Sequence, residues 1–203
     1  MTHIVETRTR KAEQSEATRL ALMAVARELF AERGYAGVGT EEIVQRARVT
    51  RGALYHHFRD KKDLFRAVHE QLEAELAEAL TRQLAEGPAD DPIALLSTGV
   101  RAFLDYCMDP ALARIALVDA PSVLGWQQWR EVDEKYGLGL VVTGLQGAMA
   151  AGAIPNQPAR PLAHLILGAL GEAGMLIANA GDPKAARAEI EPPLLALLEG
   201  LRA

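Results

Sequence analysis

Residues 51 to 59 carry several hydrogen-bond donors at a spacing that keeps them off the apolar side of a short helix. Leu54 and Phe58 mark that apolar side, because residues four apart lie on one face of a helix. The set left to face outward or sideways is Arg51, Tyr55, His57 and Arg59. No carboxylate interrupts the stretch before Asp60. Such a surface can donate hydrogen bonds to phosphates or to the polar edges of bases.

Two helix-start signals, ten residues apart, would position these donors. Thr40 precedes Glu41 and Glu42, and Thr50 precedes the donor-bearing segment. A threonine side chain can cap the free backbone N–H groups of a helix, and the two glutamates suit the positive end of the first helix dipole. A tight turn through residues 47 to 49 would join the two short helices. The inward apolar set is Ile43, Ala47, Val49, Leu54 and Phe58. This spacing predicts a helix-turn-helix.

The flanking segments read as longer helices. The first runs from about residue 15 to Arg33, with Gly34 as its stop signal. Its apolar face is Leu22, Val25, Ala26, Leu29 and Phe30. Asp60 is the predicted N-cap of the helix that follows, with Asp63 at the capping-box position, and that helix extends to about residue 86. Gly52, inside the second short helix, costs roughly 1 kcal/mol relative to alanine, which favours close approach of another molecule there.

Charge is distributed unevenly along the chain. The 203 residues carry a formal net charge of −5, which by itself argues against a nucleic-acid binder. Residues 1 to 62 nevertheless hold twelve Lys/Arg against eight Asp/Glu, whereas residues 63 to 203 hold ten against nineteen. The basic part of the chain is therefore the part with the helix-turn-helix pattern.

The remaining sequence is helical in pattern throughout, which predicts an all-α fold of about nine helices. The expected helices after residue 86 cover 92–108, 110–118, 122–151, 161–180 and 183–200, with breaks at Pro121 and elsewhere between them. Three parts follow: a disordered arm over 1–14, a DNA-binding domain over 15–62 and a helical domain over 63–203. The apolar run 162–180 is expected to be a helix buried on nearly all sides rather than a membrane span. Pro192 and Pro193 are expected to kink or restart the last helix.

Three linked segments resemble the DNA-binding domain of tetracycline-repressor (TetR) family transcription regulators. They are ARELFAERGY, GTEEIVQRARVTRGALYHHF and RDKKDLF, in the family's order and spacing, within residues 18 to 68. The resemblance implies a homodimer with one helix-turn-helix per subunit. It also implies a helical C-terminal domain that binds a small molecule and dimerises. A palindromic double-stranded DNA operator would be the partner.

The resemblance also implies which residues meet DNA. The first short helix would begin at Thr40 and Glu41, and Lys61 would contact a phosphate. The recognition helix would comprise Thr50, Arg51, Gly52, Ala53, Leu54, Tyr55, His56, His57 and Phe58. Arg51 is the candidate for reading a guanine edge, whereas Tyr55 and His57 would hold phosphates. Arg48 departs from the family, which commonly has glycine in the turn. Either the turn avoids a positive φ or Arg48 tolerates the strain, and its side chain faces either solvent or a phosphate.

An aromatic and sulfur-bearing set in the helical domain is a candidate wall for a small-molecule effector, although such stripes are more often simple core. The candidate ligand-binding residues are Phe103, Tyr106, Cys107, Trp126, Trp129, Tyr136, Met149, Glu172 and Met175. His164 and Glu172 sit on an apolar helix and need partners if buried. Gly168, Gly171 and Gly174 on the same helix allow close approach of another backbone. We therefore expect helices 161–180 and 183–200 to form the homodimer interface.

Two other classes compete with a ligand-responsive repressor. An enzyme is disfavoured, because no nucleophile has a base signature beside it and no His/Cys/Asp/Glu spacing suits a metal. We predict neither metal nor cofactor, and Cys107 reads as a small core residue. A ligand-independent architectural DNA binder, or an activator, stays open. A single cysteine and a polar N-terminus without an apolar signal segment fit a cytoplasmic protein without membrane attachment.

Overall fold

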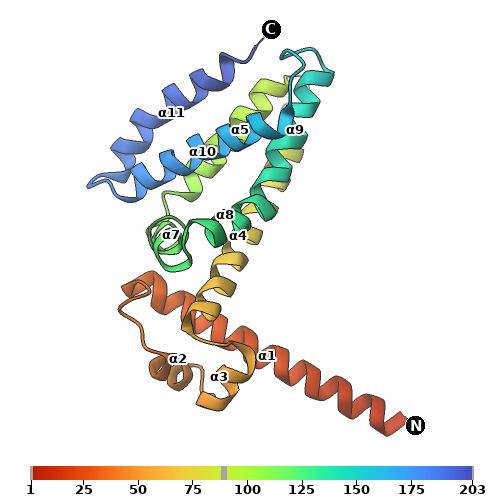
Figure 1. Ribbon diagram of the computed structural model, residues 1–203, viewed down its shortest axis with the longest axis vertical. Coiled ribbons are helices and arrows are strands. Elements are labelled where there is room, and N and C mark those ends of the chain that lie inside the picture. Colours follow the sequence, from red (N-terminus) through yellow and green to blue (C-terminus); the bar gives the residue numbers. More distant parts are fainter. Residues whose placement is uncertain (1, 88–90, 203) are drawn as a thin grey trace. The chain divides into compact units, whose positions relative to one another are not determined.

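The computed structural model describes residues 2–87 and 91–202, and these residues form nine continuous helical runs without a strand. Figure 1 traces them from the N-terminus to the C-terminus. The α-helices are α1 (Thr2–Arg33), α2 (Thr40–Arg46), α3 (Arg51–His57), α4 (Lys61–Ala85), α5 (Pro92–Tyr106), α6 (Pro110–Ala113), α7 (Ala120–Leu124), α8 (Trp126–Asp133), α9 (Gly139–Ala150), α10 (Ala159–Ala178) and α11 (Pro183–Glu199). Two π-helical segments, η1 (Arg114–Asp119) and η2 (Glu134–Leu138), continue α6 into α7 and α8 into α9. The chain divides into two compact units at His69/Glu70.

In the first unit, α2 and α3 pack on the apolar face of α1. The buried side chains include Leu22, Ala26, Leu29, Phe30, Ile43, Leu54, Phe58, Leu64 and Phe65. The Phe65 ring lies edge-on to both Phe30 and Tyr35, with centroids 5.2 Å away in each case. Edge-to-face contacts of this kind add to the free energy gained by burying the rings. The start of α4 is thereby fixed to the end of α1.

Caps define the short helices, and one predicted cap is wrong. Thr50 Oγ1 accepts a hydrogen bond from the Ala53 N–H at 3.1 Å, which confirms Thr50 as the N-cap of α3. Asp60 Oδ1 accepts from the Asp63 N–H at 2.7 Å and caps α4. At α2, however, the N-cap is Gly39, and Thr40 is already helical. Gly39 has extended dihedral angles and glycine is tolerated at an N-cap, so α2 starts one residue earlier and its start has no side-chain cap.

The N-terminal arm is also corrected. We expected disorder over residues 1–14 and a helix from residue 15, yet α1 begins at Thr2. Met1 lies outside the described residues. Residues 2 to 33 contain neither glycine nor proline and are rich in Glu, Arg, Lys, Gln and Ala, which have good helix propensity. Extending an existing helix costs far less than nucleating one, so α1 continues outward from its packed part.

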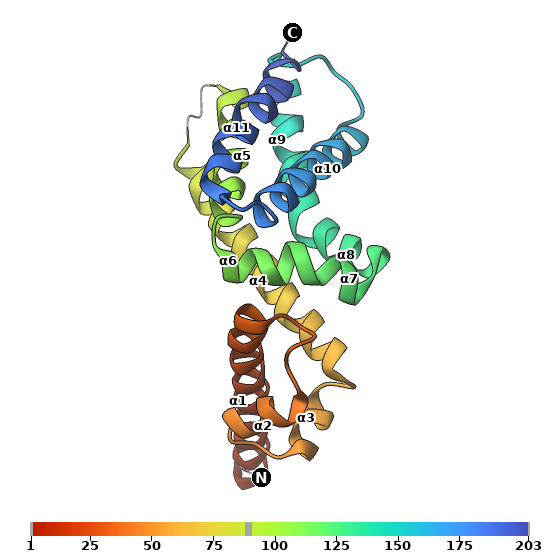
Figure 2. The same ribbon diagram turned by 90° about the vertical axis from the view of Figure 1, so that its left-hand side faces the viewer.

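The second unit is built around α5, α9, α10 and α11, which lie side by side in Figures 1 and 2. α10 is long and apolar enough, by length and composition, to cross a membrane. Its core-facing residues are Ala163, Leu167, Leu170, Ala173, Gly174 and Ile177. We expected burial on nearly all sides, but Leu165 and Leu176 are exposed on the opposite face. α10 is therefore a core helix with one apolar face uncovered in the single chain.

Two predicted helix breaks do not occur. The helical run continues through Pro121, since the π-helical segment η1 leads directly into α7 without an interruption. The run ends instead at Gly125, which has φ 83°. α11 likewise continues through Pro192 and Pro193 as one helix. Both prolines are exposed, while Leu194 and Leu198 anchor the following turn in the core, so packing holds the helix where two backbone hydrogen bonds are lost.

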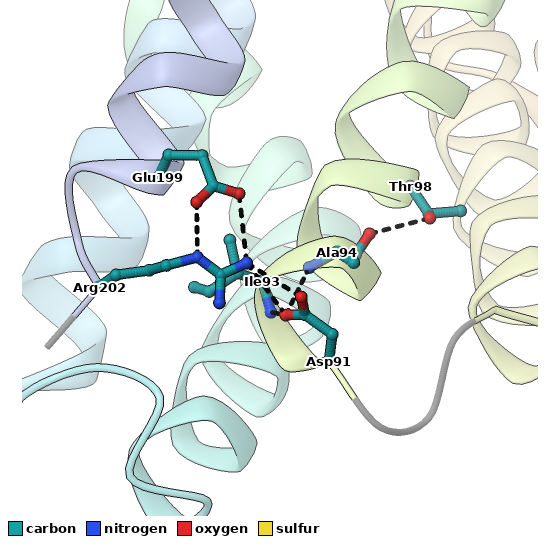
Figure 3. Close-up of polar contacts among 6 residues, drawn as sticks. All are labelled: Asp91, Ile93, Ala94, Thr98, Glu199 and Arg202. Atoms are coloured by element: carbon teal, nitrogen blue, oxygen red, sulfur yellow. Dashed lines mark hydrogen bonds and ion pairs between the residues drawn. The ribbon is translucent and has the colours of Figure 1, made fainter.

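One ion-pair cluster ties the C-terminal end of the described chain to the start of α5 (Figure 3). Arg202 Nη2 donates to both carboxylate oxygens of Asp91, at 3.0 and 3.2 Å, and Arg202 also donates to Glu199. Asp91 Oδ1 at the same time accepts from the N–H groups of Ile93 and Ala94, which caps α5. Hydrogen bonding from Arg202 and from these N–H groups holds the pKa of Asp91 below its usual value.

The turn between α2 and α3 takes the strained alternative. Arg48 has φ 55°, the only positive φ of a non-glycine residue in the described part of the chain. The Arg48 N–H donates to the Gln45 carbonyl, and the Val49 N–H donates to the Val44 carbonyl. These two hydrogen bonds form a Schellman motif, whose left-handed position normally holds glycine. Arg48 is exposed and tolerates the strain because the turn is fixed by these bonds.

Arg48→Gly should raise the free energy of unfolding by about 0.5–1 kcal/mol. The substitution removes a left-handed cost of roughly 1–2 kcal/mol, while glycine adds unfolded-state entropy worth roughly 0.5–1 kcal/mol. Urea unfolding measures the difference. Arg46→Gly, two residues earlier at the helical end of α2, is the matched control and should lower the free energy of unfolding by about 1 kcal/mol. An Arg48→Gly protein less stable than the native chain would contradict this account of the turn.

Candidate nucleic-acid interface

The exposed face of α3 carries the donors that the sequence predicted. Leu54 and Phe58 are buried, so the α3 surface is turned outward by the same core that fixes the helix. Thr50, Arg51, Gly52, Tyr55 and His56 are exposed, and Ala53 and His57 are half-buried. Tyr55 has 44% of its surface exposed, so its ring and hydroxyl are accessible to another molecule. The surface thus combines a cation, a phenol and an imidazole on seven residues of helix.

Arg51 is oriented by contacts from both sides. Its Nη1 donates to Glu41 Oε1 at 2.8 Å, which joins α3 to α2. Its guanidinium carbon also lies 5.6 Å from the centre of the Tyr55 ring. Hydrogen bonding to Tyr55, together with the charge of Glu41, raises the pKa of Arg51. Because both side chains of the pair are exposed, water screens the attraction between Arg51 and Glu41, and a guanine edge can replace this contact at little cost.

Gly52 has room for a side chain within the protein. A Cβ built there would meet only Thr50 Oγ1, at 3.8 Å. Packing inside the unit therefore does not require glycine, and neither does its backbone, since its φ is not positive. A glycine on an exposed helix face without an internal reason is consistent with close approach of another molecule.

Lys61 lies differently from the other predicted contacts. Its ammonium donates to the carbonyl oxygens of Tyr35 and Val38, at 2.9 Å each, and lies 4.0 Å from the centre of the Tyr35 ring. Partial removal from water lowers the pKa of Lys61. Two of its three N–H groups are thus engaged within the protein, on the connection between α1 and α2.

The structure brings together only part of the predicted effector wall. Phe103 and Cys107 meet at Gly174, where an added Cβ would lie 3.3 Å from Phe103 Cζ and 3.1 Å from Cys107 Sγ. Gly174 therefore serves packing within the chain. Trp129 is buried. Tyr106, Met149 and Met175 are half-buried, and both methionines pack on the core of the second unit.

The other three predicted wall residues are Trp126, Tyr136 and Glu172. Trp126 is 67% exposed, and its ring contacts Trp129 with centroids 5.2 Å apart. Tyr136 is half-buried beneath the Lys135 ammonium, 4.7 Å from its ring. Glu172 is exposed, because its position on α10 faces away from the core. Burial was the condition under which Glu172 would need a partner, and this condition is not met in the single chain.

His164, the other polar residue singled out on α10, does have partners. Its Nδ1 lies 3.4 Å from Arg130 Nη2 and 3.8 Å from Glu134 Oε1. Arg130 in turn lies 3.7 Å from Asp133. This cluster joins α10 to the junction of α8 and η2. A π-helical turn at such a junction is often found at functional sites.

Two carboxylates in the second unit escaped sequence reasoning. The Glu73 carboxyl lies among the helices, and its removal from water, together with Asp133, raises its pKa to about 8. Burial also raises the pKa of Asp133. Burial and the nearby Glu73 raise the pKa of the Cys107 thiol to about 12. A signal was present, because Glu73 follows His69 by four residues and precedes Leu76 by three, on a face of α4 that is otherwise buried.

Glu73 should make the protein less stable as pH rises. Its pKa in the folded state, about 8, lies above the ordinary value of 4.5, so the folded state holds a proton that the unfolded state has lost. Folding is therefore progressively disfavoured between these two values. Glu73→Gln should abolish a loss of about 2–3 kcal/mol between pH 6 and pH 8, measured by urea unfolding. Glu75→Gln, an exposed neighbour on α4, is the control and should leave the pH dependence as it is. An unaltered pH dependence in Glu73→Gln would contradict this assignment.

Comparison with known proteins agrees with the architecture of both units. Residues 22–68 match the family of bacterial regulatory proteins described as the tetR family. Residues 93–201 match the tetracyclin repressor-like C-terminal domain. The two matched regions coincide with the helix-turn-helix unit and with most of the helical unit.

Individual relatives give the same result. The chain is 30% identical to the transposon Tn10 TetC protein of Escherichia coli over 139 residues, which cover 68% of each protein. It is 35% identical over 71 residues to the transcriptional repressor AcnR of Corynebacterium glutamicum, covering 33% of this chain and 38% of AcnR. A crystal structure of a TetR-family regulator from Pectobacterium atrosepticum superposes with a TM-score of 0.82 at 35% identity, covering 94% of this chain and 97% of that one. The protein therefore belongs to the TetR family of transcriptional regulators, with an N-terminal helix-turn-helix that binds DNA and a C-terminal helical domain.

Proposed function

We propose that this protein is a cytoplasmic, homodimeric repressor that binds a palindromic operator and is released from it by a small-molecule effector. The observation that carries the proposal is the exposed surface of α3, where Arg51 is held by Glu41 and Tyr55 on a helix whose other face is buried. AcnR, which matches the same region, is named a repressor.

Within this proposal, α3 enters the major groove of the operator. Arg51 donates to the O6 and N7 acceptors of a guanine, a pairing worth about 1–3 kcal/mol of discrimination. Tyr55 and His57 hold phosphates, and Gly52 lets the DNA backbone approach. Thr40, Glu41, Thr50, Ala53 and His56 complete the proposed contact surface. Arg48, exposed in the turn between α2 and α3, supplies a further phosphate contact.

The dimer is proposed to form through α10 and α11. Three large apolar side chains on these helices are exposed in the single chain: Leu165 at 73%, Leu176 at 53% and Leu197 at 64%. At Gly168, on the same helix as two of these leucines, an added Cβ would meet nothing within 4 Å. A second copy related by a two-fold axis would cover this face with its own α10 and α11, as a closed dimer requires. Burying one leucine in this way contributes about 1.5–3 kcal/mol.

The effector is proposed to bind in the helical domain. Phe103, Tyr106, Cys107, Trp129, Met149 and Met175 supply an apolar and aromatic lining, with Trp126, Tyr136 and Glu172 nearer its outer side. The Glu73 and Asp133 carboxyls, which sequence reasoning missed, would add polarity to this lining. α4 runs without interruption from Lys61 to Ala85, so a shift of this helix on effector binding would alter how the two recognition helices are spaced.

The energetics of release set a requirement on the effector. Successive major grooves on one side of the DNA are about 34–36 Å apart, so a displacement of a few ångströms leaves one half-site without contacts. Moving the dimer from mostly bound to mostly free requires that the effector favour the released arrangement by a factor on the order of 10⁴.

Unbiased selection of bound duplexes from a random pool tests the function directly. We expect the full-length chain to enrich a palindrome with two half-sites about one helical turn apart. Arg51→Ala should lose the preference at one base pair in each half-site. Arg59→Ala, which removes an arginine that is 82% exposed and paired with Asp63, is the matched control and should weaken all sequences alike. Enrichment of no site would favour the ligand-independent architectural binder, and equal losses on operator and random DNA would refute base reading by Arg51.

Sedimentation at micromolar concentration tests the dimer. The native chain should sediment as a dimer, and Leu165→Glu should shift it to a monomer, because the substitution buries a charge at the centre of the proposed interface. Val118→Glu, at a partly exposed apolar residue on η1, is the control and should remain dimeric. A native chain that sediments as a monomer would refute the interface assigned to α10 and α11.

A further inference from the structure

We propose that Lys61 is a positioning residue for operator binding: its ammonium fastens the connection between α1 and α2 to the start of α4, and so places α2, instead of holding a DNA phosphate. The operator half of this inference rests on the proposed function. Its structural half concerns the free protein and stands independently.

The Lys61 ammonium makes its contacts within the protein, with the connection between α1 and α2. Nζ donates at 2.9 Å to the carbonyl oxygens of Tyr35 and Val38, which precede it by 26 and 23 residues. The Tyr35 ring lies 4.0 Å from the same nitrogen, within the range of a cation–π contact. An ammonium has three N–H groups, and a phosphate could therefore engage only the one that these carbonyls leave.

The connection that Lys61 contacts runs from Gly34, with φ 73°, to Gly39. Val38 is buried, and the Tyr35 ring packs against Phe30 and Phe65, so Lys61 acts together with these apolar contacts. α2, which it leads into, has seven residues and no side-chain cap at its start. Helices so short are not stable alone in water. Two charge-assisted hydrogen bonds to this connection therefore help to determine where α2 begins, together with the burial of Ile43 and Val44.

A second side chain at the start of α4, Phe65, also contacts Tyr35. Phe65 follows Lys61 by four residues, which puts both on one face of α4. The Phe65 ring meets the Tyr35 ring edge-on at 5.2 Å, so one face of α4 holds Tyr35 by its ring and by its carbonyl. The lowered pKa of Lys61, caused by partial burial, agrees with an ammonium directed inward rather than toward solvent.

The two roles predict different dependences on salt. A lysine that neutralises a phosphate releases counterions, and its removal lowers the slope of log affinity against log salt by about 0.9. A lysine that only places α2 leaves that slope unchanged, although its removal misaligns the helices that make the contacts. Three measurements together distinguish the phosphate-binding role from the positioning role: operator affinity, its dependence on salt, and amide hydrogen exchange of the free protein.

The experiment uses the full-length chain, the duplex most enriched by the native protein, and a random duplex of equal length. Lys61→Met keeps the apolar stem and removes the ammonium. We expect operator affinity to fall about tenfold, corresponding to one charge-assisted hydrogen bond, with an unchanged salt slope. Amide hydrogen exchange of the free protein should become faster over residues 34–40. Lys61→Gln, whose amide can reach one carbonyl, should give an intermediate loss and keeps the test usable if the methionine variant folds poorly.

Chemical rescue provides a positive control. Lys61→Cys followed by 2-bromoethylamine rebuilds a lysine-like ammonium and should restore both affinity and slow exchange. Cys107 should not react, because it is buried and its thiol pKa is raised to about 12. Lys62→Cys, treated identically, is the matched control and should show no loss of protection over residues 34–40.

Each remaining outcome overturns the proposal. A salt slope reduced by about 0.9 with unchanged exchange in the free protein would make Lys61 a phosphate contact. Unchanged affinity with reduced thermal stability would make it a stabilising residue without a part in DNA binding. If the native chain enriches no duplex, the proposed function fails. In that case, unchanged amide hydrogen exchange over residues 34–40 in free Lys61→Met would by itself refute the structural part of the proposal.

Discussion

The DNA-binding unit depends on one constraint: α2 and α3 have seven residues each and cannot be stable alone. Their geometry must come from burial, and the core under them is an aromatic and aliphatic cluster in which Phe65 lies edge-on to Phe30 and Tyr35. Because Leu54 is fully buried against α1, the opposite side of α3 is presented outward without further machinery. The orientation of Arg51 follows from this packing, together with the contact to Glu41.

The helical domain differs from the DNA-binding unit, because its apolar core also contains ionisable groups. Glu73 and Asp133 are held where the charged form is disfavoured, and Arg130 and His164 compensate only at the edge of that region. Such an arrangement costs stability, and natural proteins retain it chiefly at functional sites. The proposed effector site coincides with the part of the domain that carries this cost.

Sequence reasoning succeeded where a local pattern has one structural solution. The Thr50 and Asp60 caps, the buried Leu54 and Phe58 and the all-α architecture all follow from spacing within a few residues. It was wrong at Thr40, where Gly39 is the N-cap, and at Pro121, which lies inside a continuous helical run. It was also wrong at Pro192–Pro193, where the burial of Leu194 and Leu198 anchors the helix. The helical N-terminal segment was missed because propensity alone does not show whether a packed helix lies next to it.

The amino-acid sequence by itself determined the local elements of this protein. They are a short helix with hydrogen-bond donors on its outer side and longer amphipathic helices before and after it. Periodicity and capping are local properties, so no distant contact was needed to infer them. Only the tertiary structure decided what individual polar groups do. Lys61 donates to carbonyl oxygens more than twenty residues away in the sequence. The Glu73 carboxyl is removed from water by helices whose arrangement the sequence does not show, whereas Glu172 stays exposed to solvent. Burial and partner choice are set by residues far apart in the chain, and these determine whether a charge binds DNA, holds the fold or faces solvent.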